Sequence, residues 1–149
     1  MALEDTLVRK SLKKFLLPAL KDMGYNGKGW EFQRQSSSLD LLSVQFWKYG
    51  GQFILEAARQ PRGDLHTSWG EVVPESQLTV AHAPTLKRAR LGPVEGAGDS
   101  WFVYSAFGDD QSRFDALARR VTELLPQLEH WLNTKEVGTH VRPFSFNGS

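Results

Sequence analysis

Cysteine is absent from this chain of 149 residues, so neither a disulfide framework nor thiolate chemistry is available to it. Long apolar runs are absent too. Nowhere do about 18 apolar residues follow one another, so no membrane-spanning helix is expected. The acidic N-terminal sequence has no apolar run behind it and does not resemble a secretory signal. Together these absences predict a cytoplasmic protein without membrane association.

A large excess of charge of either sign is also missing. Lys and Arg number 18 and Asp and Glu number 17, which gives a formal net charge of +1. Dedicated duplex-DNA and membrane-surface binders are usually more basic. The composition therefore disfavours a strong global field and leaves local patches open.

No catalytic or metal-binding motif stands in the sequence. None of the four histidines has another His, Asp or Glu at metal-ligand spacing: His66, His82, His130 and His140. The glycine-rich segment 92–98 carries Glu95 and lacks the helix-opening lysine of a phosphate-binding loop. We expect no catalytic residue, no metal and no cofactor. Enzymatic activity is left open, and its absence is favoured.

Apolar residues at helical spacing mark both ends of the chain, and the clearest 3.6-residue period runs from Phe114 to Leu132. Between the two helices lie short segments that alternate between apolar and polar residues. This order predicts an α+β fold in which an antiparallel β-sheet, a meander with a central hairpin, is flanked by an N-terminal helix and a long C-terminal helix. We expect one domain over residues 1–136. An irregular tail is expected over 137–149, where Val141, Phe144 and Phe146 could dock as an edge strand.

The most informative stretch is the predicted hairpin over residues 39–59. Two runs rich in aromatic residues flank Gly50-Gly51, and type I′ turns need positive φ at both central positions. With these glycines as the turn, Phe46 faces Leu55 and Gln45 faces Glu56. One face then closes a core and carries Leu42, Val44, Phe46, Leu55 and Ala57. The opposite face carries Ser43, Gln45, Trp47, Tyr49, Ile54 and Glu56. We leave open whether the tail or a second subunit covers this face.

Two clusters of basic residues stand out. A strand near 86–91 would place Arg88 and Arg90 on one side, close to the hairpin. A second cluster lies on the first helix: Arg9, Lys10, Lys13 and Lys14. Some single-stranded RNA binders combine aromatic residues on an open sheet face with arginines. The plainer interpretation is that both clusters are solvated faces of ordinary elements.

A further observation concerns five segments of the chain: Phe15–Tyr25, Trp30–Arg34, Val44–Phe53, Arg88–Leu91 and Trp101–Phe102. These segments resemble a bacterial family of uncharacterised proteins, domain of unknown function 4304. The resemblance spans Leu12 to Trp131. It implies an α+β fold and a bacterial cytosolic setting, and it supplies no catalytic residues.

The favoured hypothesis is a non-enzymatic protein-binding module, for example an immunity-type protein that sequesters a bacterial toxin or effector by steric occlusion. The residues expected to contact the partner are Trp47, Tyr49, Gln45, Glu56, Arg88 and Arg90. Replacing Trp47 and Arg88 by Ala is expected to abolish binding without unfolding the chain. Two alternatives remain: a nucleic-acid or nucleotide binder that uses the basic and aromatic residues, and a metal-independent hydrolase built from residues such as Asp64, His66 and Glu71.

Overall fold

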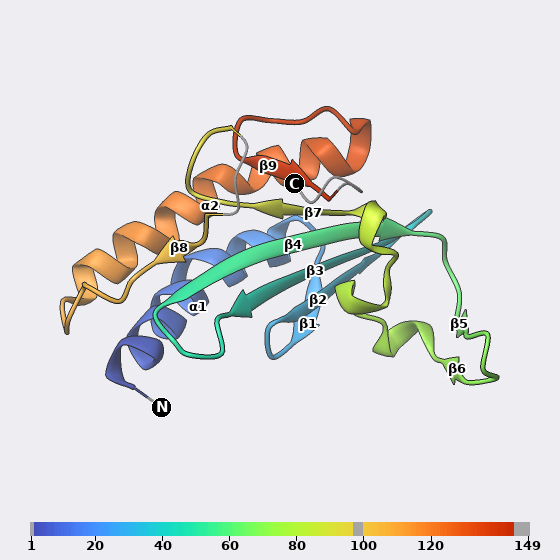
Figure 1. Ribbon diagram of the computed structural model, residues 1–149, viewed down its shortest axis with the longest axis horizontal. Coiled ribbons are helices and arrows are strands. Elements are labelled where there is room, and N and C mark those ends of the chain that lie inside the picture. The colour runs from blue at the N-terminus through green and yellow to red at the C-terminus, as the bar shows by residue number, and fades with distance from the viewer. Residues whose placement is uncertain (1, 97–99, 145–149) are drawn as a thin grey trace.

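Two long helices and one antiparallel sheet of seven strands make up most of the fold (Figure 1). The structure is a computed structural model, and it describes residues 2–96 and 100–144. Helix α1 spans Leu3–Asp22 and α2 spans Gln111–Thr134. The strand order is β1-β2-β3-β4-β7-β9, and β8 also pairs with β4. The α+β arrangement expected from the sequence is confirmed.

The strands of the large sheet are short except for the central pair. They are β1 (Asn26–Lys28), β2 (Glu31–Gln35), β3 (Leu39–Phe46), β4 (Gln52–Gln60), β7 (Arg88–Leu91), β8 (Phe102–Val103) and β9 (Val141–Pro143). A separate two-stranded sheet joins β5 (Leu65–His66) to β6 (Val72–Val73), and three 3₁₀ turns follow it: η1 (Glu75–Gln77), η2 (Val80–His82) and η3 (Thr85–Lys87).

The main core lies between the two helices and one face of the sheet. Helix α2 buries the apolar stripe that its sequence predicts, from Phe114 to Leu132. From the sheet come Leu42 and Val44 of β3 and Leu55 and Ala57 of β4. Burial of this continuous apolar surface is the main force that holds the helices on the sheet.

The hairpin register differs from the expected one by two residues. Phe46 pairs with Phe53, not with Leu55, because a longer loop connects the strands. The Trp47 N–H donates to the Gln52 carbonyl, and a tight turn follows in which Gly50 N–H donates to the Trp47 carbonyl. Four-residue loops built around such a turn are a common alternative to the two-residue type I′ turn.

The faces assigned from the sequence survive this shift, because side chains alternate with a period of two. Val44, Leu55 and Ala57 lie in the main core, as expected. Ser43 and Glu56 lie on the opposite, helix-free face, where they are direct partners.

One end of the helix-free face is covered by the segment 61–87, seen at the right of Figure 1. Leu39 and Leu41 of β3 pack there against Val73, Leu78 and Val80 in a second, smaller core. The other end of this face, toward the Trp47 loop, carries the residues of functional interest.

Strand β9 belongs to the segment that the sequence suggested as a tail. Val141 pairs with Leu91 and Arg142 with Arg90, so β9 forms an edge of the sheet. Val141 is buried, which fits docking as an edge strand. Phe146, expected in the same strand, lies outside the described residues.

Candidate functional site

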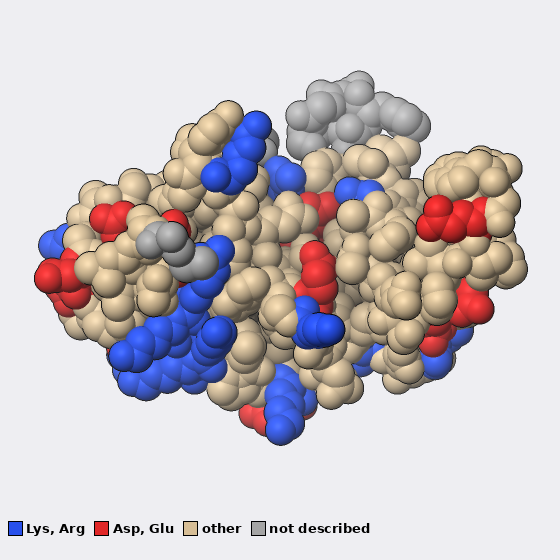
Figure 2. All heavy atoms as spheres, turned by 90° about the horizontal axis from the view of Figure 1, so that it is seen from below, with Lys and Arg blue, Asp and Glu red and all other residues tan. Residues whose placement is uncertain are grey.

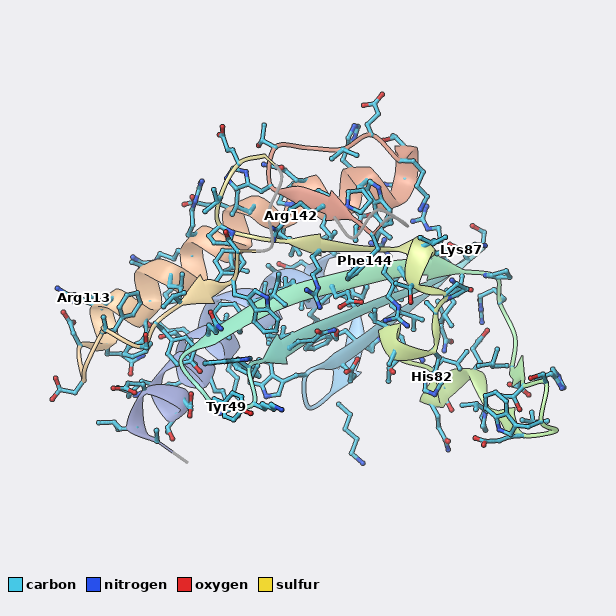
Figure 3. The ribbon with its side chains drawn as sticks, in the orientation of Figure 1. Tyr49, His82, Lys87, Arg113, Arg142 and Phe144 are labelled. Atoms are coloured by element: carbon cyan, nitrogen blue, oxygen red, sulfur yellow. The ribbon has the colours of Figure 1, made fainter. Side chains whose placement is uncertain are left out.

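Two exposed aromatic side chains mark the turn end of the β3–β4 hairpin. Trp47 is 42% exposed and Tyr49 is 72% exposed. Their ring centroids lie 5.0 Å apart in an edge-to-face arrangement, and Lys48 Nζ lies 4.9 Å from the centroid of the Tyr49 ring. Figure 3 places Tyr49 at the lower left, at the turn end of the hairpin. We call Trp47, Lys48 and Tyr49 the hairpin tip.

The loop that carries the hairpin tip is anchored to the rest of the fold. Gly51 accepts a hydrogen bond from Tyr104 N–H at 2.9 Å through its carbonyl oxygen. The Tyr104 hydroxyl in turn donates to the Asp5 carboxylate of α1. Asp5 also lies against Gly50, where a Cβ would come within 3.3 Å of Asp5 Oδ2. These contacts attach the loop to Tyr104 and to α1 and so restrict its conformation.

Glu56 is a buried carboxylate on the helix-free face, with only 2% of its surface exposed. It accepts a hydrogen bond from Gln45 Nε2 at 2.7 Å. Arg88 Nη1 lies 3.4 Å from Oε1, and Arg90 Nε lies 3.5 Å from Oε2. A buried carboxylate needs such partners, because desolvation strongly penalises an isolated charge.

The two arginines are also bound elsewhere. Arg88 donates from Nε and Nη2 to the Ala83 carbonyl, at 2.9 and 2.6 Å. The Arg90 guanidinium lies 5.5 Å from the Trp101 ring centroid and 5.0 Å from that of Phe144. Both side chains are 20% exposed. They therefore help to hold neighbouring segments on the sheet.

The six residues expected to contact a partner thus fall into two groups. Trp47 and Tyr49 lie at the surface, whereas Gln45, Arg88 and Arg90 surround the buried Glu56. The sequence placed Gln45 directly opposite Glu56, but the actual contact is diagonal, since Gln45 pairs with Ile54. Their role in binding stays a prediction.

A second carboxylate lies in the same row of the sheet. Glu31 of β2 pairs with Ser43, which in turn pairs with Glu56. Partial desolvation, together with the Glu56 charge, raises the pKa of Glu31 to about 6. Glu31 is exposed, so its titration is open to solvent.

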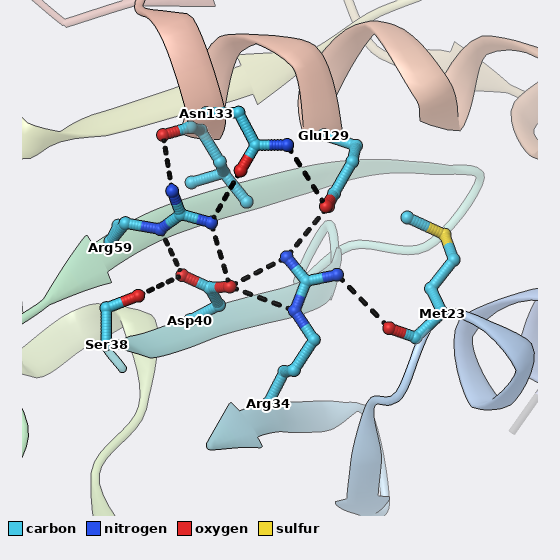
Figure 4. Close-up of polar contacts among 8 residues, drawn as sticks. Met23, Arg34, Ser38, Asp40, Arg59, Glu129 and Asn133 are labelled. Atoms are coloured by element: carbon cyan, nitrogen blue, oxygen red, sulfur yellow. Dashed lines mark hydrogen bonds and ion pairs between the residues drawn. The ribbon is translucent and has the colours of Figure 1, made fainter. Parts of the chain in front are cut away.

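Sequence reasoning missed an ion-pair network on the other face of the sheet (Figure 4). Asp40, 1% exposed, accepts hydrogen bonds from Arg59 Nε at 2.6 Å and from Arg34 Nη2 at 2.7 Å. Arg34 Nη2 also donates to Glu129 of α2 at 2.9 Å, and Arg59 Nη2 donates to Asn133 at 2.9 Å. The network therefore fastens α2 to three strands.

The pKa of Asp40 reflects this environment. Burial alone would raise it, but the hydrogen bonds from Arg59 and Arg34 outweigh burial and hold the pKa below its ordinary value. The carboxylate is thus ionised at neutral pH and balanced by two guanidinium groups. We assign this network a structural role.

A hollow of about 760 Å³ lies between the β1–β2 edge and the segment 76–79. Its lining includes Glu31, Gln33 and Gln35. Gln33 is already engaged, because its Nε2 donates to the carbonyls of Glu75 and Leu78 at 2.7 Å. The Gln33 amide is therefore already bonded within the fold.

The residues considered for a hydrolase lie on the small β5–β6 hairpin and beside it. His66, Asp64 and Glu71 are exposed there. Asp64 Oδ1 accepts the Glu75 N–H at 2.9 Å, and Glu71 Oε2 accepts Trp69 Nε1 at 3.3 Å. Both carboxylates thus accept hydrogen bonds from residues of their own segment, 64–75.

Residues 2–96 and 100–144 offer neither a metal-ligand cluster nor a membrane-spanning helix. No group of three or more His, Cys, Asp or Glu is placed to hold a metal ion there. Within the same residues, neither long helix has the apolar length that crossing a membrane requires.

Comparison of the chain with family models, curated proteins and solved structures finds no match. The resemblance to the domain of unknown function 4304 family stays a prediction.

Proposed function

We propose that this chain is a non-enzymatic protein-binding module that contacts its partner through the hairpin tip. The observation that carries the proposal is the exposed pair Trp47 and Tyr49, packed edge to face at the end of the hairpin. Trp and Tyr are the residues that most often dominate binding energy at protein interfaces. Their rings bury a large apolar area, and each keeps a polar atom for a hydrogen bond.

The anchored loop supports the same proposal. Gly50 and Gly51 adopt φ values of 81° and 88°, and Gly51 is bound by Tyr104. A loop that is already held in its bound shape loses less conformational entropy on association. The hairpin tip is thus suited to a rigid contact.

A finer proposal concerns the class of partner. We propose that the module is an immunity-type protein of the bacterial cytoplasm that sequesters a toxin or effector. Steric occlusion needs only a rigid protruding surface and no chemistry of its own. The proposal is supported by the hairpin tip alone, and the identity of the toxin is what the following experiment supplies.

The experiment uses tagged forms of this 149-residue chain as bait in a nuclease-treated lysate of the source organism. Wild type is compared with Trp47→Ala/Tyr49→Ala and with Trp69→Ala. Trp69 is a matched control because it is 76% exposed and lies on the β5–β6 turn, outside the proposed interface. Bound proteins are identified and quantified by mass spectrometry.

The proposal expects one stoichiometric protein that wild type and Trp69→Ala retain and that the double variant loses. A protein retained equally by all three baits would place the interface elsewhere. Loss from the double variant counts only if its circular dichroism and thermal unfolding match those of wild type.

A further inference from the structure

Basic side chains on α1 lie beside the hairpin tip. Thr6, Arg9, Lys10 and Lys13 line one shallow hollow on the outer side of the helix. The Arg9 guanidinium lies 4.1 Å from the centroid of the Phe46 ring, the residue just before Trp47. Asp5, one turn earlier on α1, lies near Gly50 of the tip loop, since a Cβ added there would be 3.3 Å from Asp5 Oδ2. The first half of α1 is therefore a neighbour of the tip loop, with Arg9 on the Phe46 side of the hairpin.

The charge on this surface is largely unbalanced. Lys10 and Lys13 are exposed and form no ion pair with any residue in 2–96 or 100–144. The neighbouring Lys14 has a contact with Asp115, at a long 3.8 Å. Figure 2 shows the resulting cluster of blue side chains at the lower left of the molecule. Elsewhere on the face that Figure 2 shows, basic and acidic side chains are interspersed.

We infer that the partner presents an acidic protein surface to Lys10, Lys13 and the hairpin tip. This inference rests on the proposed function and adds the chemistry of the partner. Acidic side chains would contact the α1 lysines at the rim while apolar atoms pack on Trp47 and Tyr49. Rim charges of this kind steer encounter and set the salt dependence of binding.

The geometry of the tip favours an acidic protein over a nucleic-acid strand. Single strands bind by stacking successive bases on open aromatic faces along a basic groove. Here the Trp47 and Tyr49 rings pack edge to face against each other. Lys48 Nζ also lies over the Tyr49 ring. A stacked base would have to displace these contacts.

The test uses fluorescence anisotropy with two labelled probes, a glutamate- and leucine-rich peptide and an oligothymidylate of equal charge. The protein titrated into each probe is the full chain in one of three forms: wild type, Lys10→Glu/Lys13→Glu or Lys21→Glu/Lys87→Glu. The last variant makes the same change in net charge, but at two exposed lysines that do not line the hollow on α1. Each titration is run at about 50 mM and about 300 mM NaCl, because screening separates the rim charges from apolar contacts.

We expect wild type to bind the peptide in preference to the oligothymidylate. Lys10→Glu/Lys13→Glu should weaken peptide binding about tenfold at low salt, and the matched variant by less than about twofold. Equal weakening by both charge variants would overturn the inference, as would no peptide binding. Tighter binding of the oligothymidylate would do so too and would indicate a nucleic-acid partner.

The inference and the proposed function fail in different ways. The protein captured in the lysate experiment is eluted from wild type with a salt gradient and offered to Lys10→Glu/Lys13→Glu. If that variant retains it as wild type does, while Trp47→Ala/Tyr49→Ala loses it, the proposed function stands and the acidic partner is wrong. If both the tip variant and the charge variant retain it, both proposals are wrong.

Discussion

Arg59 donates through Nε to Asp40 Oδ1 at 2.6 Å, and the two residues are direct partners in the β3–β4 ladder. On the other side of Asp40, Arg34 is its direct partner in the β2–β3 ladder. One buried carboxylate thus joins three neighbouring strands, and the arginines extend the connection to α2.

Removing the Asp40 charge should destabilise the fold strongly. In Asp40→Asn the side chain keeps its size, but the partly buried Arg59 guanidinium loses its counter-charge and Arg34 keeps only Glu129. Breaking a buried pair in this way costs about 3 kcal/mol or more. Urea unfolding at neutral pH measures the loss, with Asp109→Asn, at an exposed position, as the control. Equal midpoints for the two variants would mean that the network does not contribute.

The same network should set the acid limb of stability. The pKa of Asp40 in the folded chain is lowered, so its contribution is complete above the unfolded pKa of about 4 and is lost as the pH falls through the folded value. Wild type should therefore lose stability steeply below about pH 4. Asp40→Asn should show a shallower slope there. Chemical unfolding between neutral and acidic pH gives both curves, and parallel curves would contradict the prediction.

Glu31 should act in the opposite direction. Its folded pKa of about 6 lies above the unfolded one, so the stability it allows in acid is lost as the pH rises through about 6. Glu31→Gln should therefore raise the melting temperature above that pH and not below about pH 4. The gain should stay well under about 1 kcal/mol, because the side chain is exposed and screened. Glu95→Gln, at an exposed loop position, is the control for scanning fluorimetry.

Arg88→Ala should destabilise the chain, unlike Trp47→Ala. Arg88 donates to the Ala83 and Ala81 carbonyls and lies beside Glu56. Its loss therefore removes the guanidinium donor from the buried Ala83 carbonyl and one cation from the buried Glu56. We expect about 1–3 kcal/mol for Arg88→Ala and about 0.5 kcal/mol or less for the exposed Trp47→Ala. Thermal unfolding of both variants distinguishes them. The result decides whether Arg88 is usable in binding tests, as the sequence had suggested.

The tip loop should require glycine at position 51. Gly51 has a φ of 88°, and a Cβ there would lie 3.0 Å from the Ser105 Cβ. Gly29 has a φ of 65° but nothing within 4 Å of an added Cβ. Gly51→Ala should therefore lose more stability than the about 1 kcal/mol expected from backbone strain alone in Gly29→Ala. Similar unfolding midpoints would show that the loop yields at Ser105.

The sequence predicts those features of the fold that depend on local periodicity. The apolar stripe of α2 and the two faces of the hairpin follow from periods of 3.6 and two residues. The hairpin faces came out correctly although the register did not, since a shift of two residues returns every side chain to the same face. The β5–β6 sheet carries no comparable period, and its two-residue strands were not predicted.

The candidate site is harder to read from the sequence because it depends on register and tertiary contact. Arg34, Asp40 and Arg59 become neighbours only when the β3–β4 pairing is known to the residue. With the correct four-residue loop, the Asp40–Arg59 pair would have followed by counting. Nothing in the sequence places α1 beside the hairpin tip, because that proximity arises from contacts of Asp5 and Arg9 with the loop and with Phe46.

Strand β9 covers the edge of β7, although it is synthesised about 50 residues after β7. Until residues 141–143 emerge from the ribosome, β7 presents its outer backbone groups as an open edge. The nascent chain can assemble the hairpin and α1 first, and it closes this edge only after residues 141–143 have been synthesised. A chaperone or a neighbouring nascent chain would therefore find its binding strand at Arg88–Leu91, the segment that later fixes Glu56.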